Sequence, residues 1–577
     1  MRRTFAAIAL SCCCLLALSA PAVGATHRGA STAARTGGAS TAASTAASTS
    51  EGPIPVAPSS IPPVGRRLSA DQVLEIANRL PKLRSVRHEY RGSYGGAYLK
   101  GPGRWQVSYF SRSQKEIGQV IIAENGRVLE QWTGFQVAWT MARGYPGAFG
   151  RHVNALYIWL PLCVLFMVPF VNWRRPFALA HLDLLVLLSF SVSLAFFNHG
   201  NIYASVPLTY PPLLYLLARM LALALWGKGA GRPPRSWIPT PWLAVGVVFL
   251  LGFRIALNVT DANVIDVGYA GVIGAQRITD GKPLYGHYPA DNEHGDTYGP
   301  VNYELYVPFE QIFGWSGTWD DLPAAHATAI VFDLLAVALI FLLGLRIRGP
   351  ALGVALAYAW VAYPFTLYAL ESDSNDTIVA VLLLAVLLCA SSPPARGVFA
   401  ALAGLTKLAP LALAPLLATH ALRELPARRR PLAFALFGGA FAVTVLLVSI
   451  PALAHDSLHE IYERTIAYQE NRGSPFSVWG LYGLHGLRSA VQAIAVALAL
   501  ALAVVPRRPG VAALAAASAA ILIALQLGIE HWFYLYIPWF FGLVMVALLA
   551  REGEIKPPRA ASDAASGSAR SSPLAVA

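Results

Sequence analysis

Charged residues are scarce in this chain, and their scarcity excludes an ordinary soluble protein. Only 13% of the 577 residues are charged, whereas 55% are hydrophobic. Soluble domains carry roughly 25% charged residues, so this chain has too little polar surface to cover itself in water. Apolar stretches of about 20 residues, the length of a helix that crosses a bilayer, recur along the sequence. The sequence therefore predicts a multi-pass membrane protein.

Motifs that announce a nucleotide or metal site are missing as well. No glycine-rich phosphate loop joins a strand to a helix, so a nucleotide sugar is not indicated as a substrate. The chain has no HExxH motif, no Cys/His cluster and no clear Asp-x-Asp pair. Its five cysteines lack metal-ligand spacing and are interpreted as small apolar residues. One loop contains a cluster of three acidic residues and a histidine, Asp291, Glu293, His294 and Asp296. We interpret them as solvated loop residues rather than as a weak cation site. We therefore predict no cofactor, and a divalent metal ion is not indicated.

The net charge of +13 describes topology rather than a nucleic-acid partner. Basic residues cluster in short breaks between apolar runs, as expected for loops that stay cytoplasmic during insertion. These clusters are Arg174 and Arg175, Lys228, Arg232 and Arg235, Arg346 and Arg348, Arg428 to Arg430, and Arg507 and Arg508. We therefore expect membrane lipids around the protein and no nucleic acid as a partner.

The two ends of the chain have the composition of processed or unstructured segments. Residues 1–25 place two arginines before a short apolar run that ends in small residues, which predicts a secretory signal peptide. An uncleaved anchor is the alternative, and either one leaves the next segment outside the cytoplasm. Residues 26–65, rich in Ala, Ser, Thr and Pro, are predicted to be a disordered tether because they cannot bury enough apolar surface. The tail at 553–577 is predicted to be disordered for the same reason.

Residues 66–150 are expected to form a small extracytoplasmic α+β domain. Ser69 is a candidate N-cap for an amphipathic helix that Pro81 ends. Two alternating stretches follow, joined by a hairpin turn at 124–126. A helix followed by a hairpin with an Asn-Gly-Arg-Val turn resembles the PepSY domain. That resemblance implies binding or regulation, and a purely structural module is the alternative.

Residues 151–552 are predicted to form an all-α polytopic membrane bundle of about thirteen spans. The apolar runs centre on 155–171, 182–197, 209–226, 241–257, 327–345, 350–369, 376–390, 397–405, 409–421, 432–450, 488–505, 511–527 and 533–549. With the amino terminus outside, an odd number of spans places the carboxyl terminus in the cytoplasm. The two short runs on either side of Lys407 fit a bent hairpin better than one long helix.

Most polar residues of interest fall on the outer side of this topology. The outward-facing segments are 258–326, 371–376, 451–487 and 528–532. In the first segment, Asp266 lies where the chain leaves the bilayer, and a carboxylate there is costly unless it is paired or useful. An aspartate can take the proton of an acceptor hydroxyl as that hydroxyl attacks a sugar. The tyrosines of this loop have a simpler explanation as interfacial anchors.

Several motifs of the first outer loop occur in the order found in one enzyme superfamily. They are Asp266-Val-Gly-Tyr269, Asp280-Gly-Lys-Pro-Leu-Tyr285 and Thr297-Tyr298-Gly299-Pro300. Together they resemble the first outer loop of the GT-C glycosyltransferases. The closest likeness is to the bacterial mannosyltransferases of the family 87 type, which use a polyprenyl-phosphate sugar. Their pattern in the last segment is Tyr-x-Pro before the next span, to which the Tyr-Gly-Pro segment here is a looser fit than the turn is to its own pattern.

Further motifs follow in the same order, so the likeness covers roughly residues 240–550. Ser374-Asn375-Asp376 opens a span, a Lys-x-x-Pro hairpin begins at Lys407, and Glu530-His531 precedes the final span. The resemblance implies that Asp266 is the catalytic base. The same resemblance implies that the substrate is bound by Tyr269, Tyr285, Tyr298, Asn375, Asp376, Lys407, Arg472, Glu530 and His531.

The resemblance gives the three basic candidates, Lys407, Arg472 and His531, the task of holding the lipid phosphate. Cations there would stabilise the charge that develops on the departing phosphate. The alternatives are a snorkelling lysine, a solvated loop arginine and an interfacial histidine. Glu530 could orient His531, or both could sit in headgroup water. Helix capping is the safer interpretation for Asn375.

The resemblance implies a membrane-embedded glycosyltransferase at the cell membrane. Its donor would be a polyprenyl-phosphate sugar, with mannose as the favoured hexose, and its acceptor an extracytoplasmic glycolipid or cell-envelope glycan. A transporter or flippase for a lipid-linked substrate is the rival, and it would favour ionisable residues within the spans. A third interpretation is a structural or sensory protein in which the outer domain does the work.

Overall fold

A computed structural model of the protein describes residues 53–144, 151–226, 236–319, 322–505 and 510–550. The chain divides into two compact units, Met1–Arg143 and Gly144–Ala577, and each is described by itself. The predicted signal peptide and the predicted carboxyl-terminal tail lie outside the described residues. So does the predicted tether as far as residue 52.

The amino-terminal unit combines helices with an antiparallel sheet whose strand order is β1-β2-β3-β4-β5. Its elements are β1 (Ile54–Val56), α2 (Ala70–Arg79), α3 (Pro81–Glu89), β2 (Tyr94–Leu99), β3 (Arg104–Phe110), β4 (Glu116–Ala123), β5 (Val128–Thr133) and α4 (Phe135–Ala138). Each strand pairs with the strand before it in the sequence. The predicted α+β unit is therefore present, although its PepSY-like identity is not confirmed.

Local sequence signals set the boundaries of α2. The Ser69 side chain accepts a hydrogen bond from the Gln72 amide at 3.2 Å, and the Gln72 side chain accepts one from the Ser69 amide at 2.9 Å. This reciprocal pair is a capping box. Pro81 cannot donate the amide hydrogen bond that would continue α2, and it becomes the first residue of α3 instead. Both predicted boundaries are confirmed.

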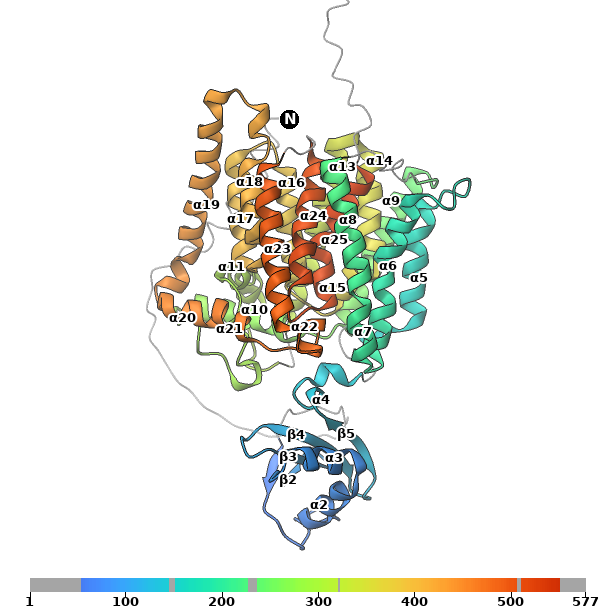
Figure 1. The fold of residues 1–577 in the computed structure, drawn as a ribbon, viewed down its shortest axis with the longest axis vertical. Coiled ribbons are helices and arrows are strands. Elements are labelled where there is room, and N and C mark those ends of the chain that lie inside the picture. Colours follow the sequence, from blue (N-terminus) through green and yellow to red (C-terminus); the bar gives the residue numbers. More distant parts are fainter. Residues whose placement is uncertain (1–52, 145–150, 227–235, 320–321, 506–509, 551–577) are drawn as a thin grey trace, which may run out of the picture. The chain divides into compact units, whose positions relative to one another are not determined.

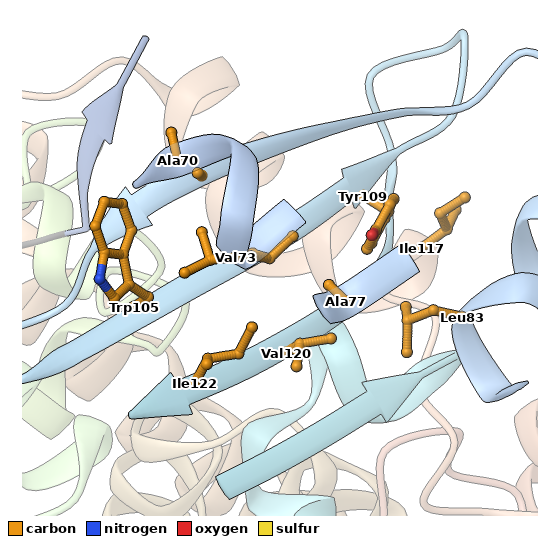
Figure 2. Packing of buried hydrophobic residues seen from close by; sticks show 11 residues of the cluster. Ala70, Val73, Ala77, Leu83, Trp105, Tyr109, Ile117, Val120 and Ile122 are labelled. Atoms are coloured by element: carbon orange, nitrogen blue, oxygen red, sulfur yellow. The ribbon is translucent and has the colours of Figure 1, made fainter. Parts of the chain in front are cut away.

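The core of this unit is one cluster of buried side chains from α2, α3 and the sheet (Figure 2). Trp105, Val107 and Tyr109 of β3 all belong to it, because alternate residues of a strand point to the same face. The predicted turn at 124–126 joins β4 to β5, and Gly126 there has a φ of 80°. The predicted start at residue 66 is too late, since β1 already pairs with the edge of β2.

The second unit is helical. Its main elements are α5 (Leu156–Met167), α6 (Leu179–Asn198), α7 (Ile202–Leu208), α8 (Tyr210–Leu225), α9 (Thr240–Asp261), α10 (Asp266–Thr279), α11 (Pro300–Glu304), α12 (Val307–Phe313), α13 (Pro323–Arg348), α14 (Pro350–Ala362), α15 (Pro364–Glu371), α16 (Asp376–Leu388), α17 (Pro393–Thr406), α18 (Ala414–Thr419), α19 (Arg430–Leu453), α20 (Leu458–Tyr462), α21 (Tyr468–Asn471), α22 (Val478–Leu481), α23 (His485–Val504), α24 (Val511–Leu527) and α25 (Ile537–Leu549). Figure 1 shows the short helices α10, α20, α21 and α22 at the same end of this bundle.

Among the described residues, six helices are long and apolar enough to cross a membrane, or seven if the bent pair α14 and α15 forms one span. Shorter apolar helices lie at Leu156–Phe170, Asp376–Leu388, Val511–Leu527 and Tyr534–Leu549. Every predicted apolar run overlaps helical structure, but the predicted number of thirteen spans is not confirmed. The difference arises because several runs are divided into helices shorter than a bilayer requires.

A buried break in the chain replaces one predicted outer turn. Helices α14 and α15 meet at an angle of 57°, where Pro364 starts the second helix. Four buried residues, Ser372 to Asn375, then separate α15 from α16. Asp373 within this break has a φ of 46°, a conformation that few residues other than glycine adopt. The segment 371–376 is thus enclosed by protein rather than exposed.

The bent hairpin predicted at Lys407 is present. Helix α17 ends at Thr406, and Lys407 itself adopts an extended conformation with φ −141° and ψ 142°. The chain then returns, because Arg396 near the start of α17 donates to the carbonyls of Leu417 (3.1 Å) and His420 (3.2 Å). The turn of the hairpin therefore presents Lys407 at its tip.

Two ion pairs lie within candidate spans, which the sequence patterns did not predict. Asp183 of α6 accepts from Arg219 of α8 at 2.9 Å, and Asp333 of α13 accepts from Arg254 of α9 at 2.6 Å. All four side chains are buried. Each charge is compensated by its partner, which is what a charge inside a low-dielectric bundle requires. Buried charged residues therefore also occur within the candidate spans, and not only in the outward-facing segments where most polar residues of interest are predicted.

Candidate active site

Backbone pairing with the buried break fixes the position of Asp266. The amide of Asn263 donates to the Glu371 carbonyl at 3.0 Å, and the amide of Ile265 donates to the Ser372 carbonyl at 3.2 Å. Asp266 follows immediately as the first residue of α10. Two segments that are distant in sequence therefore hold this carboxylate at one end of the bundle.

Asp266 is accessible from solvent and yet poorly hydrated. Its side chain is exposed, but protein atoms crowd around it. The resulting loss of hydration raises the pKa of Asp266 above the ordinary 3.8. The positive charges of Arg472 and Lys407 act in the opposite direction, and the negative charge of Asp376 adds to the rise. A group of charges from four separate segments thus meets at this aspartate.

Lys407 lies among aromatic rings and is held by a carboxylate. Its Nζ atom donates to Asp376 Oδ1 at 2.5 Å, and the indole of Trp539 donates to the same oxygen at 2.8 Å. The ammonium also lies 5.3 Å from the ring centres of Tyr298 and Tyr536 and 5.2 Å from that of Trp539. Only 8% of the lysine side chain is exposed. The alternative of a snorkelling surface lysine is therefore wrong.

The Tyr298-Gly299-Pro300 segment packs directly against the Lys407 hairpin. A Cβ atom at Gly299 would collide with the carbonyl of Leu405, so only glycine allows the two backbones to approach this closely. The approach places the Tyr298 ring over the Lys407 ammonium. The close contact between the two backbones thus explains why position 299 is a glycine.

His531 is held by a serine and is poorly suited to carry charge. Its Nδ1 atom lies 2.9 Å from Ser474 Oγ. Burial lowers the pKa of His531 well below 6.5, and the positive charges of Arg472 and Lys407 lower it further. The imidazole is therefore neutral near pH 7, so it can offer a hydrogen bond but not a positive charge to a phosphate.

Glu530 contacts the start of α23. It forms an ion pair with Arg488, and its carboxylate lies 3.7 Å from a ring nitrogen of His485, both of α23. Only 9% of the Glu530 side chain is exposed, so headgroup water is not its environment. The headgroup-water interpretation of this residue is therefore wrong, and its contacts tie the loop before α25 to the start of α23.

Asn375 does not cap α16 with its side chain, so that interpretation is wrong too. Its Nδ2 atom donates to Asn302 Oδ1 of α11 at 2.7 Å, and both side chains are fully buried. Asn375 Oδ1 and Asn302 Nδ2 have no hydrogen-bond partner. Buried unpaired polar atoms are rare, so this amide pair retains the capacity to bind a polar group.

The three tyrosines predicted to bind substrate have different surroundings in the structure. Tyr298 faces Lys407, as described above. Tyr269 is fully buried, stacks on Trp319 with ring centres 4.8 Å apart and donates to Asp291 at 3.3 Å. Tyr285 is also fully buried and donates to the Tyr298 carbonyl at 3.0 Å. Interfacial anchoring is wrong for Tyr269 and Tyr285, which instead support the loop around the site.

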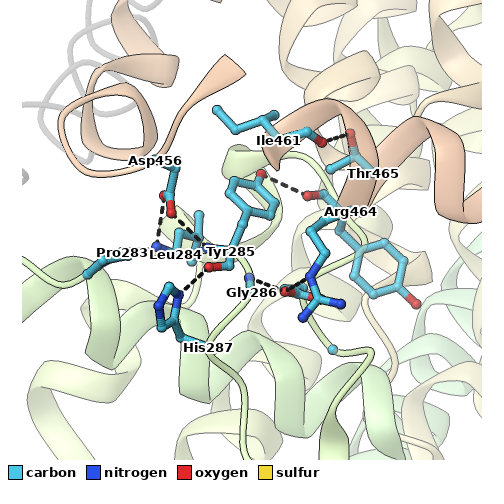
Figure 3. A network of polar contacts seen from close by, with 12 residues as sticks. Pro283, Leu284, Tyr285, Gly286, His287, Asp456, Ile461, Arg464 and Thr465 are labelled. Atoms are coloured by element: carbon cyan, nitrogen blue, oxygen red, sulfur yellow. Dashed lines mark hydrogen bonds and ion pairs between the residues drawn. The ribbon is translucent and has the colours of Figure 1, made fainter. Parts of the chain in front are cut away.

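Asp456 joins the two large loops that the sequence placed on one side (Figure 3). Its carboxylate accepts hydrogen bonds from the amides of Leu284 at 2.8 Å and Tyr285 at 3.2 Å. These amides belong to the Gly-Lys-Pro-Leu-Tyr turn. The turn is therefore held by a residue from the loop that follows α19.

A second tie runs through Asp296, one of the residues considered for a weak cation site. It accepts from the Gly286 amide at 2.6 Å and pairs with Arg464 at 2.9 Å. Burial raises the pKa of Asp296, while the Gly286 amide and Arg464 oppose that rise. No group of three His, Cys, Asp or Glu side chains able to hold a metal occurs within the described ranges.

The structure thus brings together Asp266, Tyr298, Asp376, Lys407, Arg472 and His531. Arg472 is half-buried and lies over the Tyr468 ring at 5.9 Å, so it is not a fully solvated loop residue. Sequence analysis missed Asn302, Ser474, Tyr536 and Trp539. Trp539 and Tyr536 follow the Glu530-His531 motif closely, and this proximity was the one available signal for them.

The structure is that of a membrane protein with a candidate group-transfer site. The site lies at one end of a bundle of apolar helices, where a carboxylate that could act as a base lies near two cations. Residues 297–529 match the profile of glycosyltransferase family 87. The matched segment covers less than half of the chain and excludes Asp266 and His531. The match supports a membrane glycosyltransferase of the GT-C type. No curated protein matches the sequence.

Proposed function

We propose that this protein transfers a hexose, mannose by the resemblance of its motifs, from a polyprenyl-phosphate sugar to an extracytoplasmic glycolipid or cell-envelope glycan. The observation that carries the proposal is the meeting of Asp266 with the cations Lys407 and Arg472 at one end of an apolar bundle. A base and a cationic phosphate site are the two parts that such a transfer needs.

Asp266 is proposed to accept the proton of the acceptor hydroxyl. The oxygen of that hydroxyl bonds to the anomeric carbon of the donor as the bond from this carbon to the phosphate oxygen breaks, with inversion. Poor hydration raises the pKa of Asp266, which makes its carboxylate a stronger base than that of a fully hydrated aspartate. Because it remains accessible, an acceptor can reach it.

The leaving group is a polyprenyl phosphate, and its negative charge grows as the bond breaks. Lys407 and Arg472 are proposed to stabilise that charge. Lys407 is already paired with Asp376, so its remaining N–H groups would donate to phosphate oxygens while the carboxylate fixes its position. His531 is proposed to contribute a neutral hydrogen bond, since its lowered pKa removes its charge.

The test is transfer of radiolabelled mannose from synthetic polyprenyl-phosphate-mannose to extracted membrane lipids. Asp266→Asn should reduce transfer by about 10²–10⁴-fold, the usual contribution of a general base. Glu293→Gln is the matched control, because it neutralises an exposed carboxylate of the same loop. Equal transfer by wild type and Asp266→Asn would retain the enzyme and remove Asp266 from its role.

A transporter or flippase for a lipid-linked substrate is the second candidate. The observation in its favour is the pair of buried ion pairs within candidate spans, Asp183–Arg219 and Arg254–Asp333. Each of these charges already has a partner, which suits fixed helix packing as well as transport. If wild type transfers none of several sugars but moves a labelled lipid-linked sugar across proteoliposome membranes, this candidate replaces the transferase.

The amino-terminal unit is proposed to be an extracytoplasmic binding or regulatory module, with the carboxyl terminus in the cytoplasm. Deleting residues 26–143 should leave measurable sugar transfer, because none of the proposed catalytic residues lies there. Complete loss of transfer in a correctly inserted deletion variant would support the interpretation in which this unit is the working part.

A further inference from the structure

A cavity of about 250 Å³ opens beside α10, away from Asp266. Its lining combines an aromatic ring, an aliphatic side chain and several polar groups. The lining residues are Ile273, Gln276, Arg277, Asp280, Lys282, His287, Pro289 and Trp315. Concave sites with an apolar floor and a few convergent polar groups are typical of small-molecule binding.

The charged groups of this cavity already have hydrogen-bond partners among their neighbours. Lys282 pairs with Asp280 at 2.8 Å. Arg277 donates to the carbonyls of Pro283 at 2.5 Å and His287 at 3.0 Å. Arg277 keeps its positive charge, because carbonyl groups do not neutralise it, but its N–H groups are partly occupied and the Lys282 ammonium is already paired. The lining thus presents oriented donors and acceptors of the kind that bind hydroxyl groups.

Two further groups fit the two faces of a sugar ring. Trp315 is half-buried, and its indole N–H is occupied by the Thr318 carbonyl at 3.0 Å, so it offers mainly its apolar ring surface. The Gln276 side chain is partly exposed and has no hydrogen-bond partner within the described part of the chain, where only the backbone carbonyl of this residue accepts hydrogen bonds. A hexose could pack its apolar C–H face on the Trp315 ring and form hydrogen bonds from its hydroxyls to the Gln276 side chain.

An aromatic row connects this cavity to the base. Tyr269 packs edge-on against Trp315, with ring centres 5.8 Å apart, and stacks on Trp319 at 4.8 Å. The Trp319 indole donates to the Val264 carbonyl at 2.9 Å, two residues before Asp266. Seven to ten residues of helix separate Asp266 from Ile273 and Gln276, which corresponds to roughly 10–15 Å. That spacing exceeds a single sugar ring.

We propose that the cavity beside α10 is an acceptor subsite that binds a neutral hexose unit remote from the hydroxyl attacked at Asp266. The proposal rests on the proposed transferase function and deepens it, because the acceptor must then be an oligosaccharide or a glycolipid with more than one sugar. Trp315 supplies the surface on which the ring packs, and Gln276 binds its hydroxyls.

The first test compares acceptors of different length with the full chain and radiolabelled polyprenyl-phosphate-mannose. The acceptors are alkyl mannosides that carry one or three mannose units. Trp315→Ala and Gln276→Leu should each raise KM for the trimannoside at least tenfold, with little change in kcat or in KM for the monomannoside. Trp315→Phe should retain most of the wild-type KM. An equal rise in KM for both acceptors, or no rise, overturns the proposal.

Trp237→Ala is the matched control. Its tryptophan is exposed, and its indole also donates to a backbone carbonyl, that of Val168, at 2.7 Å. It lies outside the cavity, so it should leave both KM values unchanged. A change equal to that of Trp315→Ala would show that the effect is not specific to the cavity.

A second test keeps the subsite separate from the transfer reaction. Binding of mannotriose, maltotriose and galactotriose to the purified protein, in a detergent without sugar headgroups, is followed by saturation-transfer NMR. Saturable binding to wild type that Trp315→Ala abolishes supports the subsite even if no transfer occurs, in which case only the transferase proposal fails. No saturable binding of any of the three trisaccharides overturns the subsite even if transfer is observed.

Discussion

The buried pair of Lys407 and Asp376 predicts an unequal response to loss of its two charges. Lys407→Met leaves the Asp376 carboxylate with one donor among the residues that the structure describes, the Trp539 indole. Asp376→Asn leaves the Lys407 ammonium near three aromatic rings, all within 5.3 Å. The second loss should therefore cost less stability than the first. A variant that carries both substitutions has no uncompensated charge and should cost less than Lys407→Met alone.

The magnitudes follow from burial. The side chains are 8% and 1% exposed, and their atoms lie 2.5 Å apart. Breaking such a pair by removing one partner typically costs about 3–5 kcal/mol, which is the expected loss for Lys407→Met. Cation–π contacts in a desolvated site contribute about 2 kcal/mol, so the loss for Asp376→Asn should be smaller by that amount.

Unfolding in mixed micelles by increasing SDS, followed by tryptophan fluorescence, measures these free energies. Lys282→Met is the control, because its pair with Asp280 is largely exposed and should contribute no more than about 1 kcal/mol. Equal losses for the two single variants, or a double variant whose loss is their sum, would refute the reasoning.

Three further predictions concern the site. Transfer should fall as the pH decreases through the raised pKa of Asp266, because only the carboxylate accepts a proton. Arg472→Gln removes a charge that lowers this pKa, so the acidic limb of kcat/KM should move to higher pH; an unmoved limb contradicts the assignment. Gly299→Ala should reduce transfer at least tenfold, since its Cβ would collide with the Leu405 carbonyl, and unchanged transfer would show that the hairpin can yield. Asp456→Ala should cost about 2 kcal/mol and speed hydrogen exchange at the two turn amides that it accepts from; equally slow exchange would mean that other contacts hold the turn.

Matched controls exist for the last two variants. Gly252→Ala places a Cβ in open space within α9 and should change neither transfer nor stability. Glu463→Gln alters an exposed acid beside Arg464 and should leave exchange at the turn amides unchanged. A strong effect of either control would indicate general rather than local damage.

Much of the secondary structure could be predicted from the sequence because the signals are local. Apolar runs overlap helices, the Ser69 capping box starts α2, and the hairpin at Lys407 was recognised from a short break between two runs. The number of spans was not predictable in this way. Runs such as 350–369 are continuous in composition, yet Pro364 divides this one into two helices at an angle of 57°.

The site was predicted as a set of residues but not as a set of contacts. The motif order identified Lys407 and Asp376 separately, whereas their pairing joins residues 31 positions apart. Local sequence suggests Glu530 as the neighbour that orients His531, and it gives no sign of the hydrogen bond between His531 and Ser474, 57 positions away. Such contacts depend on how helices and loops pack, which local sequence does not encode. For the same reason Asn375 was assigned to helix capping rather than to Asn302.

The ties between the loop before α13 and the loop after α19 have a consequence for building chimeric enzymes. Asp456 and Arg464 belong to one loop, while their partners, the turn amides and Asp296, belong to the other. A donor segment that replaced 258–319 alone would arrive without its anchors and leave Asp456 and Arg464 unpaired. A chimera meant to acquire the acceptor preference of another enzyme should therefore receive both loops from that enzyme together.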